Sequence, residues 1–299
     1  MVIRSSFIGA VVGLTALLGF SAAVAAQTAP PQRPAAAQAA RSPWKFNPMD
    51  RPAGDGGPAP KRDLTGTWAG PGSGLVPQFA DDDATPEDKP SLTPLGQQLM
   101  SLNKPLRPYS PAGTNDPHVR YCDPFGFPQN MRSEIRGITF GSAPNRVLVL
   151  IQYMDVWREI WTDGRPLPTN VGAPGSGLNP RYNGYSVGHW EDDYNFVVDT
   201  TGLDDRTWLT AAGYPHSMNA HVQERYTRTS HNDLKVTITV DDPKLYTKPF
   251  SLGSVRFRWV PNQQLDEWIC PASEVIEYLT TMGDPAGSDP AADEPRRRQ

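Results

Sequence analysis

The stretch "DLKVTITVDD", residues 233–242, alternates apolar and polar side chains along its length. Its apolar members are Leu234, Val236, Ile238 and Val240. A second stretch, "SVRFRWV" at 254–260, repeats the pattern with Val255, Phe257 and Trp259. Successive side chains of a strand point to opposite faces, so both stretches predict half-buried β-strands. This period of two decides the fold class, which we expect to be mainly β.

Further strands are expected on both sides of these two. "RVLVLIQYM" at 146–154 is a continuous apolar run, which predicts a strand covered on both faces. The other expected strands are "LTGTWAG" (64–70), "VWREIWT" (156–162), "GYSVGHWE" (184–191), "YNFVVDTT" (194–201) and "VQERYTRT" (222–229). Turn signals stand between them at 191–193 and 230–233, where Asp and Asn tolerate left-handed backbone.

These strands predict one antiparallel, lipocalin-like barrel with one or two short helices. An open meander leaves two exposed edges, and closure removes them. A barrel of about eight strands has an interior wide enough for one small ligand. Helical periodicity is limited to 92–102 and 271–282.

The two ends of the chain differ in composition from its middle. Residues 1–26 combine Arg4, an apolar run and a small-residue cleavage site, the parts of a secretory signal peptide. The Pro/Ala-rich segment 27–62 and the tail 282–299 cannot bury enough apolar area to order themselves, and are expected to be disordered. We therefore predict one β-barrel domain over 63–281, in a periplasmic or secreted protein with no membrane span.

Charge argues against a nucleic-acid partner. The formal net charge is −4, and Lys and Arg are scattered rather than gathered in stripes. The oligomeric state is left open.

Cys122 and Cys270 are the only cysteines. An even count in an exported chain favours a disulfide, worth roughly 4 kcal/mol in the chain-entropy model. The alternative is a pair of buried thiols that pack as small hydrophobes.

Several segments, in this order and spacing, resemble a large family of exported bacterial proteins that are mostly without assigned function. They are "DLTGTW" (63–68), "CDPFGFPQNM" (122–131), "WTDGRPLP" (161–168), "NPRYNGYSVGHWEDDYNFVVDTTG" (179–202), "GYPHS" (213–217), "ERYTR" (224–228), "DPKLYTKPF" (242–250) and "WICPASE" (268–274). The resemblance implies a lipocalin-like β-barrel and names no reaction. The chain departs from the family at "EDDY", where Gly-Asp is usual, and at "CPASE", which replaces an acidic-Asn ending.

The segment "AAGYPHSMNAHVQERY" (211–226) carries the strongest candidate site. His216 lies on a Pro-containing loop that leads into a strand with His221 and Glu224, and such loops often form sites at a barrel mouth. His216 would act as a base or hydrogen-bond donor beside Glu224. Alternatively, Glu224 pairs with Arg225 or Arg158, and His216 caps a turn.

Strand alternation leaves a second candidate group open. His189 and Glu191 share one face of their strand, and Asp199 follows on the next. If they point inward they are an acid/base set or half a metal site, and if outward they are ordinary surface. A metal held by His189, His216, His221 and Glu191 has no supporting ligand spacing, so no metal is expected. No nucleotide or other cofactor motif is present either.

Aromatic and basic residues nearby are candidates for ligand contacts. Tyr182, Tyr185 and Trp190 offer rings with polar tips near the expected cavity. Arg158 could bind a carboxylate or phenolate, or could stack on Trp157 or Trp161 as a structural cation–π pair, which is the favoured interpretation. The Gly/Pro-rich loop that starts at Thr169 is long enough to be a lid.

Two functions from different classes follow. In the first, the protein is an enzyme without a cofactor, of the lyase, isomerase or hydrolase class, that encloses a small apolar or aromatic molecule and moves protons. In the second, the barrel only binds and carries a small hydrophobic ligand. The density of ionisable residues in the recurring segments favours the first.

Overall fold

The computed structural model describes residues 52–70, 90–106, 113–132 and 137–283. The expected signal peptide (1–26), most of the expected tether and residues 284–299 lie outside them. All described residues belong to one compact unit. Among these residues no helix is long and apolar enough to cross a bilayer.

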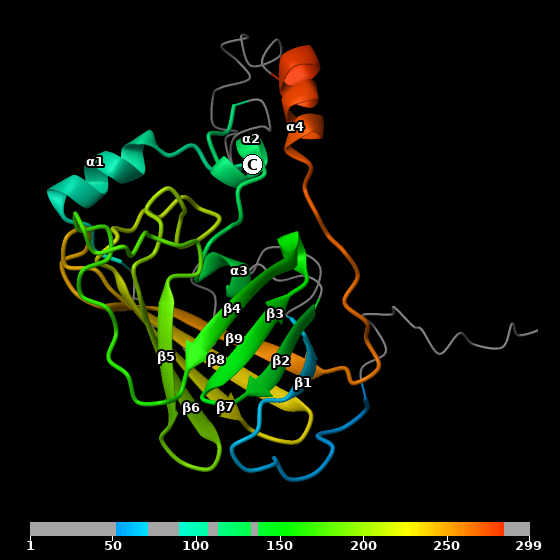
Figure 1. The fold of residues 1–299 in the computed structure, drawn as a ribbon. Helices are drawn as coiled ribbons and strands as arrows, with labels where there is room; N and C mark the ends of the chain where they lie inside the picture. The colour runs from blue at the N-terminus through cyan, green and yellow to red at the C-terminus, as the bar shows by residue number, and fades with distance from the viewer. Residues whose placement is uncertain (1–51, 71–89, 107–112, 133–136, 284–299) are drawn as a thin grey trace, which may run out of the picture. The chain divides into compact units, whose positions relative to one another are not determined.

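Nine strands close into a single barrel in sequence order (Figure 1). They are β1 (Gly66–Ala69), β2 (Gly137–Ala143), β3 (Arg146–Ile151), β4 (Val156–Trp161), β5 (Tyr185–Trp190), β6 (Asn195–Thr201), β7 (His221–Arg228), β8 (Asp233–Asp241) and β9 (Phe250–Trp259). β1 closes the ring by pairing with β9. The prediction of a closed, mainly β fold is confirmed.

One neighbouring pair departs from the expected antiparallel pattern, because β4 and β5 run parallel. The other eight pairs are antiparallel. Parallel neighbours need a crossover that returns the chain to the starting end. The Gly/Pro-rich segment 162–184 provides this return, so its length has a topological cause.

Strand alternation is seen as expected in β8 and β9. Leu234, Val236, Ile238 and Val240 are all buried, and so are Val255 and Phe257. A β-bulge between Thr237 and Thr239 shifts the register of β8 against β9. The expectation for β3 is wrong: Val149 and Ile151 are buried but Leu150 on the outer face is 45% exposed. Among the described residues, no second layer covers the outer face at Leu150.

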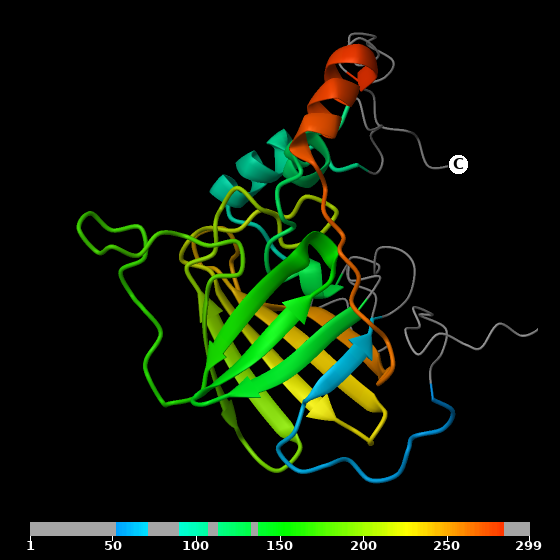
Figure 2. The ribbon, with the colours of Figure 1, turned by 45° about the vertical axis from the view of Figure 1, so that its right-hand side comes forward.

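The barrel interior is a packed hydrophobic core. Large side chains that meet there include Trp68, Phe140, Phe196, Tyr226 and, from outside the strands, Phe127 and Met131. The last two belong to a segment with two short helices, α2 (Pro117–Tyr121) and α3 (Gln129–Arg132). Figure 2 shows α3 at one end of the barrel, with α2 beyond it. We call residues 123–132 the plug.

The helices expected at 92–102 and 271–282 are present. α1 spans Pro94–Leu102, with Thr93 as its N-cap. α4 spans Ala272–Tyr278 and continues as a π-helical turn, Leu279–Gly283. A 3₁₀ turn, Tyr153–Asp155, links β3 to β4. Cys122 and Cys270 are joined by a disulfide, with Cα atoms 5.4 Å apart, which connects the end of α2 to the start of α4.

The part of the expected tether that the structure describes is attached to the barrel. Asn232 and His231 donate backbone N–H groups to the carbonyls of Asp55 and Gly57, at 2.9 Å each. Lys61 pairs with Asp193 at 2.8 Å. Residues 52–62 therefore bind the hairpin turns at the barrel end away from the plug, so the part of the chain attached to the barrel extends before Asp63.

Candidate functional site

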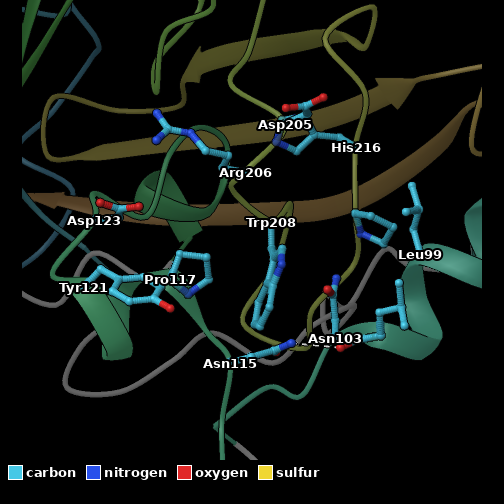
Figure 3. Close-up of a pocket in the computed structure, with 12 residues that line it drawn as sticks. Leu99, Asn103, Asn115, Pro117, Tyr121, Asp123, Asp205, Arg206, Trp208 and His216 are labelled. Carbon is cyan, nitrogen blue, oxygen red and sulfur yellow. Dashed lines mark hydrogen bonds between the residues drawn. The ribbon is translucent and has the colours of Figure 1, made fainter. Parts of the chain in front are cut away.

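A pocket of about 720 Å³ lies at the plugged end of the barrel (Figure 3). Three segments far apart in sequence form it: the end of α1, the region around α2, and the loop between β6 and β7. Its lining residues are Leu99, Leu102, Asn103, Asn115, Pro117, Tyr121, Asp123, Asp205, Arg206, Trp208, Pro215 and His216. We call it the mouth pocket. The Gly/Pro-rich loop that starts at Thr169, expected as a lid, contributes none of these lining residues.

The β6–β7 loop is held in shape by its own polar groups. Arg206 forms a two-pronged ion pair with Asp204, with Nε–Oδ1 at 2.9 Å and Nη2–Oδ2 at 2.6 Å. This pairing lowers the pKa of Asp204 and raises that of Arg206. Further along, Tyr246 donates its hydroxyl to the carbonyl of Pro215 at 2.7 Å. The loop is thus fixed both locally and against the β8–β9 connection.

His216 is 2% exposed and lies at the edge of the mouth pocket. Its Nδ1 is 3.2 Å from the Ser217 carbonyl, and its Nε2 is 2.9 Å from Thr207 Oγ1. A carbonyl only accepts, so in the neutral ring Nδ1 carries the proton and Nε2 is an acceptor. The single Thr207 hydroxyl proton is also within reach of the Asp204 carbonyl, at 2.9 Å, so Nε2 and that carbonyl compete for it. Burial lowers the pKa of His216, against the opposing charges of Asp242, Asp205 and Asp204. The ring is therefore neutral at pH 7, with Nε2 as an acceptor.

The residue after His216 anchors it. Ser217 donates its backbone N–H to Asp242 Oδ2 at 2.7 Å and its hydroxyl to Oδ1 at 2.9 Å. Asp242 is itself buried. This contact fixes the backbone that carries the imidazole, so the orientation of His216 is preorganised.

Glu224 lies deeper, inside the barrel, with no exposed surface. Arg158 Nη2 donates to its Oε2 at 2.6 Å, and the Tyr226 hydroxyl donates to Oε1 at 2.6 Å. Arg158 also donates to Ser186 and Thr200, at 3.0 and 2.6 Å. Burial and the Glu224 charge raise the pKa of Tyr226 well above its usual range. In the described chain no hydrogen bond joins His216 to Glu224, so the structure does not assemble them as a pair.

Arg158 stacks on an aromatic ring other than the expected ones. Its guanidinium lies 4.0 Å from the ring centre of Phe127, in the plug. Trp157 and Trp161 alternate to the outer face, where Trp157 is 68% exposed and Trp161 receives Arg146 and Arg165. A stacking role for Arg158 is therefore seen, but the plug supplies the ring.

The second candidate group faces outward. His189 is exposed, and Glu191 pairs through both carboxylate oxygens with Arg225. Asp199 Oδ1 accepts from His221 Nε2 at 2.9 Å and from Gln223 at 3.0 Å. The hydrogen bond that His221 donates to Asp199 raises the pKa of His221. Over the residues that the structure describes, no cluster of His, Cys, Asp and Glu is arranged to hold a metal ion.

The three aromatic candidates lie in three different places. Tyr182 is beside the pocket, with the Arg206 guanidinium 5.6 Å from its ring centre. Tyr185 is on the outer face and donates its hydroxyl to the Asn179 carbonyl at 2.9 Å. Trp190 packs against the core, 5.1 Å from Phe196. None of these three lines the mouth pocket, and Tyr182 comes nearest to it through its contact with the lining residue Arg206.

A small side pocket shares Pro117 and Trp208 with the mouth pocket and is lined by Asp116, His118 and Thr207. His118 Nδ1 donates to the Asp123 carbonyl at 2.8 Å, and Nε2 lies 2.6 Å from the Tyr153 hydroxyl. Burial lowers the pKa of His118. The ring is therefore neutral, like that of His216.

Sequence reasoning missed most of the pocket. Asp205, Arg206 and Trp208 belong to "LDDRTW" (203–208), a polar cluster directly after a strand, which is a usable signal for a loop with function. Asp116 followed by Pro117 is a helix-start signal that predicts α2. No local pattern shows that α1 and α2 meet this loop, because that contact depends on the closed barrel.

Comparisons with protein-family models, with curated proteins and with solved structures give no match to this chain.

Proposed function

We propose that this protein binds a small organic molecule in the mouth pocket. The pocket itself carries the proposal: its volume of about 720 Å³ falls within the range of roughly 300–1,000 Å³ typical of ligand sites. Trp208, Leu99 and Pro117 supply apolar wall, and charged groups stand at the rim. Fixed walls favour affinity because little is ordered on binding.

Binding is better supported than catalysis by the pair His216 and Glu224. Glu224 is already neutralised by Arg158 and hydrogen-bonded by Tyr226, so both carboxylate oxygens are occupied. A general base must reach the proton that it removes. The interior that was expected to enclose the ligand is filled by core side chains, which moves the proposed ligand to the mouth.

The resemblance to exported, lipocalin-like proteins forms part of this proposal. A closed barrel with eight antiparallel neighbour pairs is compatible with it, and the parallel pair β4–β5 is a departure from a simple up-and-down barrel. Export is proposed on the signal-like residues 1–26 alone.

A matched pair of leucines tests the location of the site. Leu102 lines the pocket and is 61% exposed, whereas Leu150 is 45% exposed on the outer barrel face. A fragment library would be screened by ligand-observed NMR against the wild type, Leu102→Asn and Leu150→Asn. Hits should lose affinity in Leu102→Asn only. Absence of hits, or equal losses in both variants, would contradict the proposal.

A second candidate function is supported by one observation. His216 is neutral, preorganised and on the pocket, with Nε2 facing the Thr207 hydroxyl at 2.9 Å. A neutral imidazole in this position would act as a base toward a bound molecule if that molecule took the place of the Thr207 hydroxyl at Nε2. If a turned-over substrate is found, His216→Gln should reduce kcat by roughly 100-fold or more, while Glu191→Gln should not.

A further inference from the structure

A disulfide lies within one wall of the mouth pocket. Tyr121 and Asp123 both line the pocket, and Cys122 between them is bonded to Cys270, 148 residues further along the chain. Cys122 is also the C-cap of α2, with a left-handed φ of 56°. The bond therefore fixes the residue at which the pocket wall turns from α2 into the plug.

α2 has little packing of its own. It is five residues long and none of its residues is buried, and a helix of that length is not stable by itself. His118 holds its beginning, with ring nitrogens 2.8 Å from the Asp123 carbonyl and 2.6 Å from the Tyr153 hydroxyl. Tyr121, at its other end, is 61% exposed. The disulfide thus acts on the end of α2 that His118 does not hold.

The other half of the bond lies on a segment attached to the barrel. The Trp268 carbonyl accepts the N–H of Met154 at 2.8 Å, and the Trp268 N–H donates to Asp155 Oδ1 at 3.1 Å. Met154 and Asp155 belong to the 3₁₀ turn between β3 and β4. Cys270 follows this fixed point by two residues, so the disulfide connects the pocket wall to the barrel.

α4, which follows Cys270, depends on the same bond. It lies beside α2 (Figures 1 and 2), and Leu279 at its end is 6% exposed. Among the described residues, the hydrogen bonds of 271–282 all lie within that segment. α4 is therefore held by apolar packing, by the chain at Cys270 and by the disulfide.

Resting on the proposed binding function, we propose that the Cys122–Cys270 disulfide is a redox switch of the mouth pocket. A dithiol opens it: one thiolate attacks a sulfur of the bond, and the second thiol then displaces the protein. Two electrons and two protons pass to Cys122 and Cys270, which become thiols, and the dithiol becomes a disulfide. The end of α2 and α4 are then released, and binding weakens because the wall must be ordered again. The nine strands contain neither cysteine, so the barrel stays closed.

Hydrogen exchange tests the release without a ligand. Wild type is compared before and after treatment with dithiothreitol, by mass spectrometry of peptides that cover 113–125, 268–282 and the strands β7 and β8. Exchange should become at least 10-fold faster in the first two regions and stay unchanged in the strands. Cys122→Ala/Cys270→Ala should exchange like reduced wild type and should not respond to dithiothreitol. Unchanged exchange in 113–125 would overturn the switch, and so would equal acceleration in β7 and β8, because the bond would then stabilise the whole fold.

Binding is tested with N-phenyl-1-naphthylamine, a neutral aromatic probe that becomes fluorescent in apolar surroundings. Its Kd should rise at least 5-fold when wild type is reduced, and should be equally high in Cys122→Ala/Cys270→Ala with or without dithiothreitol. Leu102→Asn should weaken the probe in oxidised protein, which places the probe in the pocket. An unchanged Kd after reduction would overturn the switch and leave the binding site standing.

The two measurements separate the switch from the binding function. If the probe does not bind oxidised wild type, or binds Leu102→Asn equally well, the binding proposal is contradicted. Hydrogen exchange then still decides whether the disulfide holds the pocket wall.

Discussion

Arg158 and Glu224 form an ion pair inside the barrel, with 2.6 Å between Nη2 and Oε2 and almost no exposure of either side chain. Phe127, in the plug, stacks on the guanidinium, and the Tyr226 hydroxyl donates a hydrogen bond to the other carboxylate oxygen of Glu224. The pair thus joins β4, β7 and the plug into one unit.

Breaking this pair should destabilise the fold strongly. Glu224→Gln leaves a buried guanidinium uncompensated, which typically costs about 3–5 kcal/mol. Urea unfolding measures the loss as a change in the free energy of unfolding. The matched control is Glu191→Gln, which breaks the exposed pair with Arg225 and should have a far smaller effect. Similar losses in the two variants would show that the buried pair contributes no more to stability than the exposed pair.

His216 should make the protein less stable in mild acid. Burial lowers its pKa in the folded state, so the unfolded chain binds the proton first as the pH falls below about 6.5. Stability is then lost between that pH and the lower folded pKa. His118 acts in the same direction, whereas His221, whose pKa is raised by Asp199, acts in the opposite one.

Melting curves at pH 7.5 and 5.0 measure this dependence. The fall in Tm should be smaller in His216→Gln than in the wild type. His189→Gln, which replaces an exposed histidine on the outer face, should retain the wild-type fall. A His216→Gln protein with the full pH dependence would contradict the assignment of a buried, neutral ring.

The disulfide should be quantitative in oxidised protein. Thiol titration under denaturing, non-reducing conditions should find no free thiol, and reduction should release both. The bond spans 148 residues, so the Cys122→Ala/Cys270→Ala variant should lose about 4–5 kcal/mol in the chain-entropy model. Two reactive thiols before reduction would refute the bond itself.

Gly126 lies in the plug and approaches Thr207 closely. Its φ is +74°, and an added Cβ would lie 2.6 Å from Thr207 Oγ1. Gly126→Ala should therefore cost more than the roughly 1–2 kcal/mol of left-handed strain alone. Gly175→Ala isolates the strain, since its φ is +76° but nothing lies within 4 Å of its Cβ. Chemical denaturation of both variants measures the difference in their free energies of unfolding. Equal losses would mean that the plug shifts to make room for the added methyl group at no cost.

The strands could be predicted from the sequence because a half-buried strand alternates apolar and polar side chains, whatever the rest of the chain does. The alternation from Leu234 to Val240 is an example. The row Glu224, Tyr226 and Arg228 could be identified as one face, but its direction depends on barrel closure. The direction of β5 relative to β4 also depends on a long connection whose path has no local signal.

The site was harder to predict for a related reason. His216 was a candidate because it lies on a Pro-containing loop before a strand and because imidazole can move protons near neutral pH, and it does line the pocket. The local sequence around Glu224 is equally suitable for a site, but Arg158, 66 residues earlier, forms an ion pair with it. Asp205 and Arg206 drew no prediction, because only the closed barrel places the β6–β7 loop beside α1 and α2.

At two places in the barrel, neighbouring strands are paired over only a short length. β4 and β5 share only two register pairs, as do β1 and β9, whereas β7 and β8 share eight. The barrel is therefore better regarded as two curved sheets, β1–β4 and β5–β9, that are hydrogen-bonded to each other along two short edges. Slow closure would be expected of the β1–β9 edge in particular, since its strands come from opposite ends of the domain and must search the longest stretch of chain to meet. The buried ion pair between Arg158 on β4 and Glu224 on β7 spans the other edge, β4–β5. It therefore links the two sheets where they share few backbone register pairs.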